Sequence, residues 1–240
     1  MAEQLRLDKF LADMGMGTRS EIKTWIRKGR ITLNGSVCNK PEQKVNTTSD
    51  VVTIDGQAVN YIEFLYVMLN KPAGVVSATR DNVSKTVLDL IADKKGKEIF
   101  PVGRLDKDTE GLLLLTNDGD LAHQLLSPKK HVDKTYFAKV KGRVTTDDIA
   151  LFETGVDIGE ESLTLPARLT ILQSDDISEI ELTIQEGKFH QVKRMFEAVD
   201  KEVIYLKRIS MGGLALDPNL ELGEYRELTK KEIDYLKSLN

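Results

Sequence analysis

The chain of 240 residues is poor in cysteine and has no long apolar runs. Its single cysteine, Cys38, excludes an intramolecular disulfide and a cysteine-based zinc site, which suits a reducing compartment. No segment approaches the roughly 20 apolar residues that cross a bilayer, and residues 1–6 lack the apolar core of a secretion signal. We therefore expect a cytoplasmic protein that does not enter a membrane.

The chain also lacks a positive charge excess. Its net charge of −4 argues against a protein that coats nucleic acid non-specifically. Residues 1–60, however, hold nine Lys/Arg against seven Asp/Glu, whereas the remainder holds 25 against 31. The two parts differ in character, so any contact with nucleic acid must use local basic faces.

The first 60 residues predict two short helices followed by a small antiparallel sheet. Apolar residues recur at the spacing of one helical face at Leu7, Phe10, Leu11 and Met14. Thr18 stands three positions before Glu21, as in a capping box, and opens a second helix that Gly29 ends. Alternating apolar residues then run into the turns Asn34-Gly35 and Asp55-Gly56, which are typical of hairpins.

These two helices and the following turn carry a cluster of basic residues. They are Arg6, Lys9, Arg19, Lys23, Arg27, Lys28 and Arg30. Such a face can hold several phosphates without reading bases, although a solvated amphipathic surface has the same composition. Residues 6–11 (RLDKFL), 18–21 (TRSE) and 29–35 (GRITLNG) resemble the alpha-L RNA-binding motif of a small-subunit ribosomal protein. This resemblance implies an RNA-binding domain over residues 1–59.

Residues 64–240 predict a second domain, which follows a patternless linker. Apolar runs or alternating patterns predict strands at residues 65–69, 112–115, 134–141, 179–184 and 202–209. Helices are expected around Leu121 and Leu125 and at residues 190–199 and 229–239. The predicted fold class is therefore α+β: a small N-terminal module and a larger domain on a mainly antiparallel sheet with flanking helices.

Three acids alternate in a loop directly before an apolar strand. Asp106, Asp108 and Glu110 lie between Gly103 and Gly111. They could perform acid–base chemistry, bind a divalent ion as in a metal-dependent phosphodiesterase, or satisfy turn amides. No dense second ligand cluster accompanies them, and the three histidines show no paired metal spacing, so we expect no metal.

Residues 100–119 (FPVGRLDKDTEGLLLLTNDG) resemble the signature of the bacterial rRNA pseudouridine synthases, in the branch of the small-subunit enzyme. Further segments that resemble this family are residues 70–74 (NKPAG), 134–136 (KTY), 186–195 (EGKFHQVKRM), 208–209 (RI) and 223–229 (GEYRELT). The resemblance spans almost the whole chain. It implies isomerisation of uridine to pseudouridine in ribosomal RNA, without a cofactor.

The resemblance also implies roles for five residues. Asp106 matches the catalytic carboxylate, which attacks the anomeric carbon or removes a proton from the neighbouring sugar carbon. Lys193 matches its basic partner, and a nearby cation favours the ionised form of a carboxylate in a partly dry pocket. Tyr136 matches a tyrosine that stacks on the target base, Arg104 an arginine that enters the vacated base stack, and Ile209 an apolar pocket residue. Four of these residues also have a purely structural interpretation. Lys193 could lie on a solvated helix edge and Tyr136 could pack in the sheet. Arg104 could stabilise a turn at the surface, and Ile209 could be an ordinary core residue.

We predict small-subunit (16S) rRNA as the substrate, because the N-terminal module and residues 112–123 (LLLLTNDGDLAH) are most similar to that member of the family. A large-subunit rRNA synthase is the close alternative. A non-catalytic RNA-binding assembly factor is a third; loss of Asp106, Tyr136 or Lys193 would favour it, but all three are present. Residues 129–143, with six basic residues against Asp133, form either a second phosphate-binding surface or a solvated face. We expect the protein to be a monomer.

Overall fold

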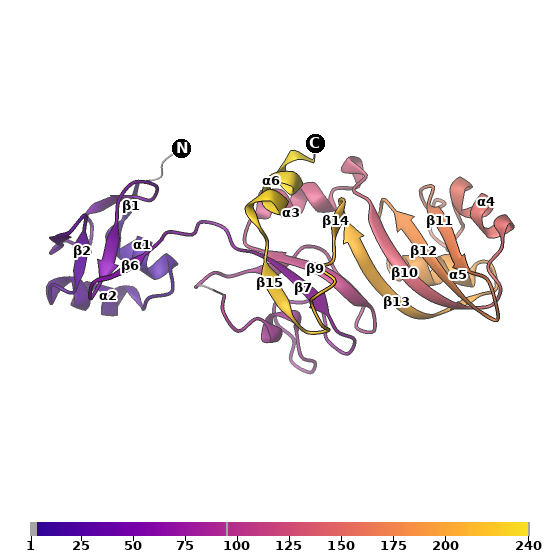
Figure 1. Ribbon diagram of the computed structural model, residues 1–240, viewed down its shortest axis with the longest axis horizontal. Helices are drawn as coiled ribbons and strands as arrows, with labels where there is room; N and C mark the ends of the chain where they lie inside the picture. Colours follow the sequence, from indigo (N-terminus) through magenta and orange to yellow (C-terminus); the bar gives the residue numbers. More distant parts are fainter. Residues whose placement is uncertain (1–3, 95, 240) are drawn as a thin grey trace. The chain divides into compact units, whose positions relative to one another are not determined.

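The structure, a computed structural model, describes residues 4–94 and 96–239. It contains two compact units (Figure 1): residues 1–65 with 92–99, and residues 66–91 with 100–240. The second domain was predicted as continuous from residue 64, whereas residues 92–99 group with the first unit. Close packing explains this difference, because a Cβ at Gly96 would lie 2.4 Å from the backbone nitrogen of Gly15. The ammonium of Lys97 also lies 5.1 Å from the centroid of the Tyr61 ring.

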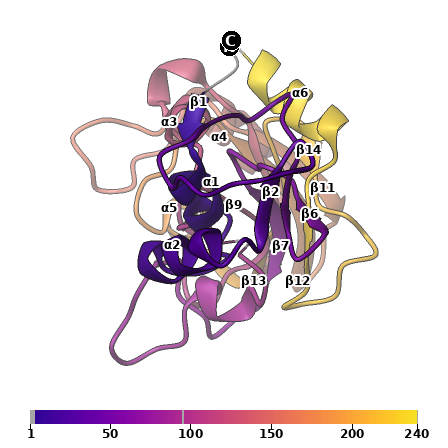
Figure 2. The same ribbon diagram turned by 90° about the vertical axis from the view of Figure 1, so that its left-hand side faces the viewer.

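The N-terminal unit packs two helices against a small sheet. Its elements are β1 (Gln4–Arg6), α1 (Leu7–Asp13), α2 (Arg19–Arg27), β2 (Ile31–Leu33), β3 (Ser36–Val37), β4 (Lys44–Asn46), β5 (Val52–Ile54) and β6 (Gln57–Val59). The antiparallel sheet has the order β3-β2-β5-β6, and β1 pairs separately with β4. Figure 2 shows α1 and α2 on one side of β2 and β6. The fully buried side chains of Phe10, Ile22 and Ile31 join these layers in one core.

The capping box and the two hairpin turns predicted for this unit are confirmed. The hydroxyl of Thr18 accepts from Glu21 N, and Glu21 accepts in return from Thr18 N at 2.8 Å, which completes the capping box. The hairpin turns place Asn34 and Asp55 in the left-handed region, with φ of 50° and 52°. Asn and Asp tolerate this conformation better than most side chains, and each is followed by a glycine.

The second unit is built on a nine-stranded sheet. Its strands are β7 (Tyr66–Lys71), β8 (Phe100–Pro101), β9 (Glu110–Thr116), β10 (Lys134–Lys141), β11 (Arg168–Gln173), β12 (Ile177–Ile184), β13 (Glu202–Met211), β14 (Leu214–Ala215) and β15 (Tyr225–Glu227). The main path is β11-β12-β10-β13-β9-β7-β15, with β8 beside β9 and β14 beside β13. Every pairing is antiparallel except that of β9 with β13. The predicted α+β class with a mainly antiparallel sheet is confirmed.

Four α-helices and two 3₁₀ turns complete this unit. They are η1 (Val87–Leu90), α3 (Gly119–Leu126), η2 (Pro128–Lys130), α4 (Thr146–Thr154), α5 (Gln191–Glu197) and α6 (Lys230–Ser238). Phe152 of α4 and Phe196 of α5, both fully buried, meet edge to face at 5.1 Å. Leu125 of α3 and Leu236 of α6 line one small apolar cavity with Tyr66 of β7, so these helices share a second core region. No helix in the described part of the chain is long and apolar enough to span a bilayer.

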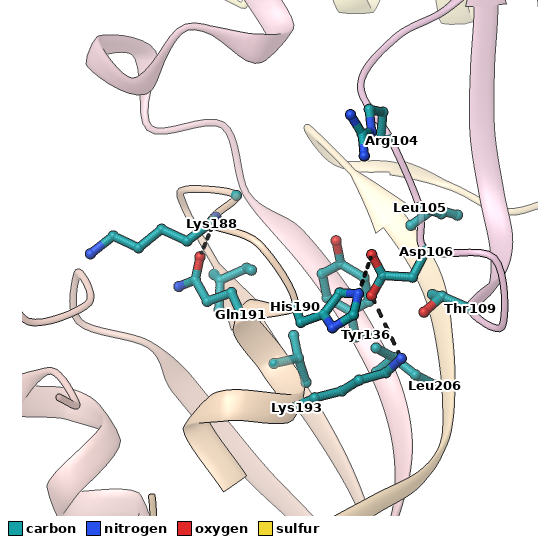
Figure 3. A pocket seen from close by; sticks show the side chains of 13 residues that line it. Arg104, Leu105, Asp106, Thr109, Tyr136, Lys188, His190, Gln191, Lys193 and Leu206 are labelled. Atoms are coloured by element: carbon teal, nitrogen blue, oxygen red, sulfur yellow. Dashed lines mark hydrogen bonds and ion pairs between the residues drawn. The ribbon is translucent and has the colours of Figure 1, made fainter. Parts of the chain in front are cut away.

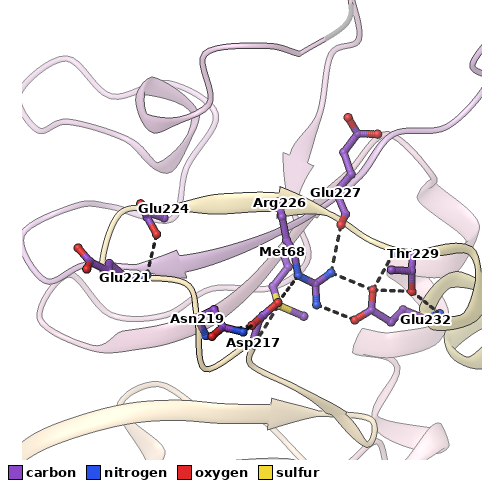
Figure 4. Close-up of polar contacts among 9 residues, drawn as sticks. All are labelled: Met68, Asp217, Asn219, Glu221, Glu224, Arg226, Glu227, Thr229 and Glu232. Carbon is purple, nitrogen blue, oxygen red and sulfur yellow. Dashed lines mark hydrogen bonds and ion pairs between the residues drawn. The ribbon is translucent and has the colours of Figure 1, made fainter.

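The C-terminal helix is fastened to the sheet by Arg226 of β15 (Figure 4). The guanidinium donates to Asp217 at 2.6 Å and to both carboxylate oxygens of Glu232 at 2.7 and 2.9 Å. Glu232 also caps α6 by accepting from Thr229 N at 2.7 Å. The hydrogen bonds from Arg226, with those from Thr229, lower the pKa of Glu232 to about 2. This cluster links β15 directly to the start of α6.

Candidate active site

A small pocket of about 80 Å³ brings together residues predicted from three distant segments. Asp106 comes from the loop before β9, Tyr136 from β10 and Lys193 from α5 (Figure 3). The Lys193 ammonium lies 3.6 Å from Asp106 Oδ2, and His190 Nε2 lies 3.7 Å from Oδ1. The carboxylate therefore sits between a lysine and an imidazole.

A buried lysine, Lys71, binds the backbone of the loop that carries Asp106. Lys71, at the end of β7, is fully buried. Its ammonium donates to the carbonyl oxygens of Pro72, Asp106, Lys107 and Thr109 at 3.0, 3.0, 3.3 and 2.7 Å. Burial lowers the pKa of Lys71 to about 8, although the loop carboxylates oppose this shift. One side chain thus holds the backbone on both sides of Asp106.

The loop leads directly into β9 at a point where β9 and β13 are paired very closely. Gly111 of β9 pairs with Arg208 of β13 in the parallel part of the sheet. A Cβ at Gly111 would lie 2.2 Å from the carbonyl oxygen of Arg208, and its φ is +100°. Only glycine fits there, which explains the glycine at the end of the acidic loop.

The three loop acids do not converge on one point. Asp108 accepts from the Lys193 ammonium at 2.7 and 2.8 Å, and this contact is the main reason that the pKa of Asp108 is lowered. Glu110 instead accepts from the Tyr205 hydroxyl at 2.8 Å. Within residues 4–94 and 96–239, no group of three or more His, Cys, Asp or Glu is placed to hold a metal ion. The phosphodiesterase interpretation therefore has no ligand cluster to support it.

Lys193 was predicted as the partner of Asp106, and the structure places it between two carboxylates. Its ammonium is closer to Asp108, at 2.7 Å, than to Asp106, at 3.6 Å. The lysine is mostly buried, whereas Asp108 is exposed. Asp108 therefore orients Lys193 from the solvent side while the lysine faces Asp106.

Apolar side chains form the wall beside Tyr136. The tyrosine is buried, and Ile184, Val192 and Leu206 line the same pocket. Ile209, predicted as the apolar pocket residue, lines neither this pocket nor the neighbouring cavity. The pairing of β13 with β10 skips Ile209 at a register shift between Arg208 and Ser210, and Leu206 of β13 is the residue that reaches the pocket. The prediction chose the correct strand but the wrong residue.

A second cavity of about 440 Å³ shares Arg104, Asp106 and Tyr136 with the first. Phe189 lies at its wall, is 69% exposed and stacks on His190 with ring centroids 3.8 Å apart. Neither ring was predicted from the sequence to belong to the site. The sequence did show an aromatic residue, Phe189, inside the family-like segment 186–195. The left-handed backbone of His190, with φ of 49°, has no signal in the sequence.

In the N-terminal unit, two predicted RNA-binding arginines pair with acids of the same unit. Arg6 donates to the buried Asp8 by two hydrogen bonds of 3.0 Å, and this contact is the main cause of the lowered pKa of Asp8. Arg30 pairs with Asp55 and lies 5.1 Å from the Trp25 ring centroid. Four further predicted residues form no ion pair within the described residues: Lys9, Arg19, Arg27 and Lys28.

Three of the six basic residues in the second basic stretch, residues 129–143, pair with neighbouring acids. Lys139 pairs with Glu179 at 3.0 Å, and Lys141 lies 3.8 Å from Glu202. Arg143 is also within 3.8 Å of an acid, Asp175. The solvated-face interpretation is therefore favoured for Lys139, Lys141 and Arg143, whereas Lys134, at the start of β10, is buried and lies outside this ion-paired surface.

Comparisons with known proteins agree with this geometry. Residues 65–198 match the family model of RNA pseudouridylate synthase, and residues 5–52 match the S4 domain. The chain is 50% identical over 234 residues to an uncharacterized RNA pseudouridine synthase, YtzG, of Bacillus subtilis (97% of this chain, 98% of the relative). It is 42% identical to the ribosomal large subunit pseudouridine synthase B of Bacillus subtilis (98% and 96%) and to the ribosomal small subunit pseudouridine synthase A of Vibrio vulnificus (96% and 98%).

A solved structure, a crystal structure of pseudouridylate synthase, covers 97% of this chain at 39% identity, with 99% of its own length matched and a TM-score of 0.68. Relatives of this identity and coverage share fold and reaction type with the chain along nearly its full length. The chain thus belongs to the RNA pseudouridylate synthase family and is an RNA pseudouridine synthase with an N-terminal S4 domain.

Proposed function

We propose that this enzyme isomerises one specific uridine of small-subunit ribosomal RNA, with Asp106 as the catalytic carboxylate. The observation that carries the assignment of Asp106 is its position in one pocket with Tyr136 and Lys193. The reaction breaks the bond from ribose to the base nitrogen and joins the same sugar carbon to a ring carbon. It is redox-neutral, so a carboxylate and its electrostatic surroundings are sufficient chemistry.

Asp106 acts on the ribose in its ionised form. It either attacks the anomeric carbon as a nucleophile or removes a proton from the neighbouring sugar carbon to give a glycal. Both routes need a carboxylate oxygen that is not occupied by a strong hydrogen bond. The Lys193 ammonium and the His190 imidazole lie 3.6 and 3.7 Å from the carboxylate oxygens, so the lysine charge stabilises negative charge there without a short contact to either oxygen.

Tyr136 stacks on the base of the flipped uridine. Stacking on an aromatic ring contributes about 1–3 kcal/mol per base, which offsets much of the few kcal/mol that extraction of a base costs. Arg104 is exposed at the mouth of both cavities, where it can enter the gap that the uridine leaves in the RNA stack. Leu206 provides the apolar contact first assigned to Ile209.

The N-terminal unit anchors helical RNA through its phosphates. The side chains of Arg19, Arg27 and Lys28 are exposed, and that of Lys9, on α1, is half-buried. Cations without a carboxylate partner are available to replace the counterions of phosphates. Arg6 and Arg30 contribute less to this anchoring, because Asp8 and Asp55 already hold them.

The preference for small-subunit rRNA rests on similarity of sequence segments. The equal identities to a large-subunit and a small-subunit synthase leave large-subunit rRNA as the alternative substrate. We also propose that the enzyme acts as a monomer, since one chain supplies every residue of the pocket. Size-exclusion chromatography with light scattering tests this expectation.

The assignment is tested by incubating the protein with small- and large-subunit rRNA transcripts that carry tritium on the uracil carbon that forms the new bond. Wild type should release tritium from the small-subunit transcript, whereas Asp106→Asn should release none. Equal release by both proteins would refute the role of Asp106. Release from the large-subunit transcript alone would reverse the substrate assignment.

A further inference from the structure

Two buried cations line the larger cavity beside the catalytic pocket. Lys134 of β10 is 8% exposed and Arg208 of β13 is 2% exposed. Lys134 lies two residues before Tyr136, and Arg208 is the cross-strand partner of Tyr136. Residues two apart on a strand, and residues opposite each other on paired strands, share one face of a sheet. The three side chains therefore point to the same side, into the cavity.

Neither cation has an anionic partner. The Lys134 ammonium donates to the carbonyl oxygen of Val132 at 3.1 Å, and Arg208 Nε donates to that of Leu112 at 2.8 Å. Arg208 Nη2 is buried and has no hydrogen-bond partner. Among the described residues, no carboxylate forms an ion pair with either side chain. Burial together with the charge of Arg208 lowers the pKa of Lys134, and the more distant charges of Asp133 and Glu186 oppose this shift only in part.

The nearest acids are already engaged elsewhere. Glu186 lines the same cavity, but its carboxylate accepts from Leu165 N and from Gln191 Nε2, both at 2.8 Å. Asp133 accepts from Gln185 at 2.9 Å. Buried charge without a partner is costly, so this end of the cavity is stabilised when an anion enters it.

The position of the two cations selects the kind of anion. Lys134 and Arg208 line the larger cavity only and Lys193 lines the smaller pocket only, whereas Asp106 and His190 lie where the two meet and line both. The cations are thus next to the reacting nucleoside rather than around it. A guanidinium and an ammonium in one cavity match the oxygens of a phosphate group.

We propose that Lys134 and Arg208 bind a backbone phosphate directly adjacent to the uridine that enters the catalytic pocket. This inference rests on the proposed function, in that it takes RNA as the ligand. The phosphate fixes the backbone while the base turns toward Tyr136, so the site recognises a polynucleotide rather than a free nucleoside. Lys134 and Arg208 are positioning residues, because they hold the substrate and do not touch the reacting atoms.

The test compares RNA binding by full-length wild type, Lys134→Met and Lys134→Arg as a function of salt. The probe is the small-subunit rRNA transcript, and Lys139→Met is the matched control, since it removes one ammonium from the other face of the same strand. A hydrogen bond to a charged group is worth about 1.5–3 kcal/mol, so Lys134→Met should weaken binding about tenfold or more. Loss of one phosphate contact should also reduce the slope of log K against log salt by about 0.7–0.9.

Lys134→Arg should keep the wild-type slope, and Lys139→Met should stay within twofold of wild-type affinity. A Lys134→Met variant with wild-type affinity and slope would overturn the proposal. So would a variant that binds normally but reacts slowly in a single turnover, because the charge would then act on the chemistry.

A second measurement covers the case in which Lys134→Met does not fold. Inorganic phosphate should raise the melting temperature of wild type more than that of Arg208→Gln at the same ionic strength, and an equal rise would overturn the proposal. The outcomes also separate the two claims. Absence of tritium release by wild type, combined with the expected loss of salt slope, would refute the proposed reaction and leave the phosphate site standing.

Discussion

Replacement of Lys71 by methionine tests whether the catalytic loop is held by a single buried charge. Methionine fills a similar volume but removes the ammonium that binds four carbonyl oxygens around Asp106. The loop should then lose its anchor while the apolar core around β7 remains. Lys107→Met is the control, because the Lys107 ammonium is exposed and donates to the Ser84 hydroxyl at 3.1 Å rather than to the carbonyls of the loop.

The magnitude follows from two opposing contributions. The carbonyl oxygens of Asp106 and Lys107 keep backbone donors, Thr109 N and Gly74 N. The two that lose their donor, those of Pro72 and Thr109, cost about 1–3 kcal/mol each, or about 2–6 kcal/mol in total. Removing the ammonium also removes the cost of burying it. The shift of the Lys71 pKa from 10.5 to about 8 corresponds to about 3 kcal/mol. We therefore expect Lys71→Met to lower the free energy of unfolding of the catalytic unit by only about 1 kcal/mol at pH 7.

The sign of the pH dependence is also determined. The pKa of Lys71 is lower in the folded state, so the cost of burying the charge is full below pH 8 and is relieved as pH rises to 10.5. The stability difference between wild type and Lys71→Met should therefore grow between pH 8 and 10.5. Urea unfolding at several pH values measures this difference, with the loss of secondary structure followed by far-UV circular dichroism.

Activity provides the second readout. A displacement of about 1 Å at a reacting group costs about a hundredfold in rate, so single-turnover tritium release should fall by that order in Lys71→Met. RNA affinity should change little, since Lys71 is buried. A wild-type rate of single-turnover tritium release in Lys71→Met would refute the argument that this ammonium positions the loop.

Three further predictions concern the site and the C-terminal helix. Asp108→Asn should keep kcat/KM within tenfold of wild type because Lys193 still faces Asp106, whereas Lys193→Met should lose at least a hundredfold; equal losses would contradict this division. Phe189→Ala should weaken RNA binding at least fivefold and Phe189→Trp should not, with the exposed Leu172→Ala as control, since the open ring face offers a base about 1–3 kcal/mol of stacking; unchanged affinity in Phe189→Ala would count against this. Glu232→Gln should lose about 2 kcal/mol of stability at pH 7, and because the folded-state pKa of Glu232 is depressed, the gap from wild type should close as pH falls from 4.5 toward about 2; a gap independent of pH would exclude the Arg226 pair as its source.

Much of the secondary structure was readable because its signals are local. The strand predicted at residues 134–141 coincides with β10, and the helix at residues 229–239 differs from α6 by one residue at each end. Both carry strong patterns: alternation in the strand, and a Thr229–Glu232 capping box in the helix. Helix α4 was not predicted, because its apolar residues 149–152 are consecutive and present no helical face.

Edge strands were missed for a related reason. β11 alternates poorly, since most of its side chains are exposed at the border of the sheet. β15 is only three residues long and is held by pairing with β7 and by the ion pairs of Arg226. Such elements depend on partners that are distant in sequence, and no local pattern encodes them.

Part of the site was likewise available from sequence. The loop of Asp106, the tyrosine of β10 and the lysine of α5 were all predicted, and the structure places them in one pocket. Ile209 was misplaced because the face of a strand residue is decided by register. A shift of one position exchanges the two faces of a strand. The same uncertainty hid Leu206 and Arg208, which point into the cavities from β13.

The sequence by itself determined the features that arise within a few residues: the helix caps, the Asx-Gly turns, the glycine-bounded acidic loop and the segments that place the chain in its family. The tertiary structure alone decided which charges meet. It set Lys71 beneath the loop, shared Lys193 between Asp106 and Asp108, paired Arg30 with an acid, and left Lys134 and Arg208 without one. Electrostatic interactions depend on distance and burial. For Lys71 and Lys193 both are fixed only when segments 35 and 85 residues apart in sequence are brought together, whereas Arg6 and Asp8, two residues apart, are a local pair.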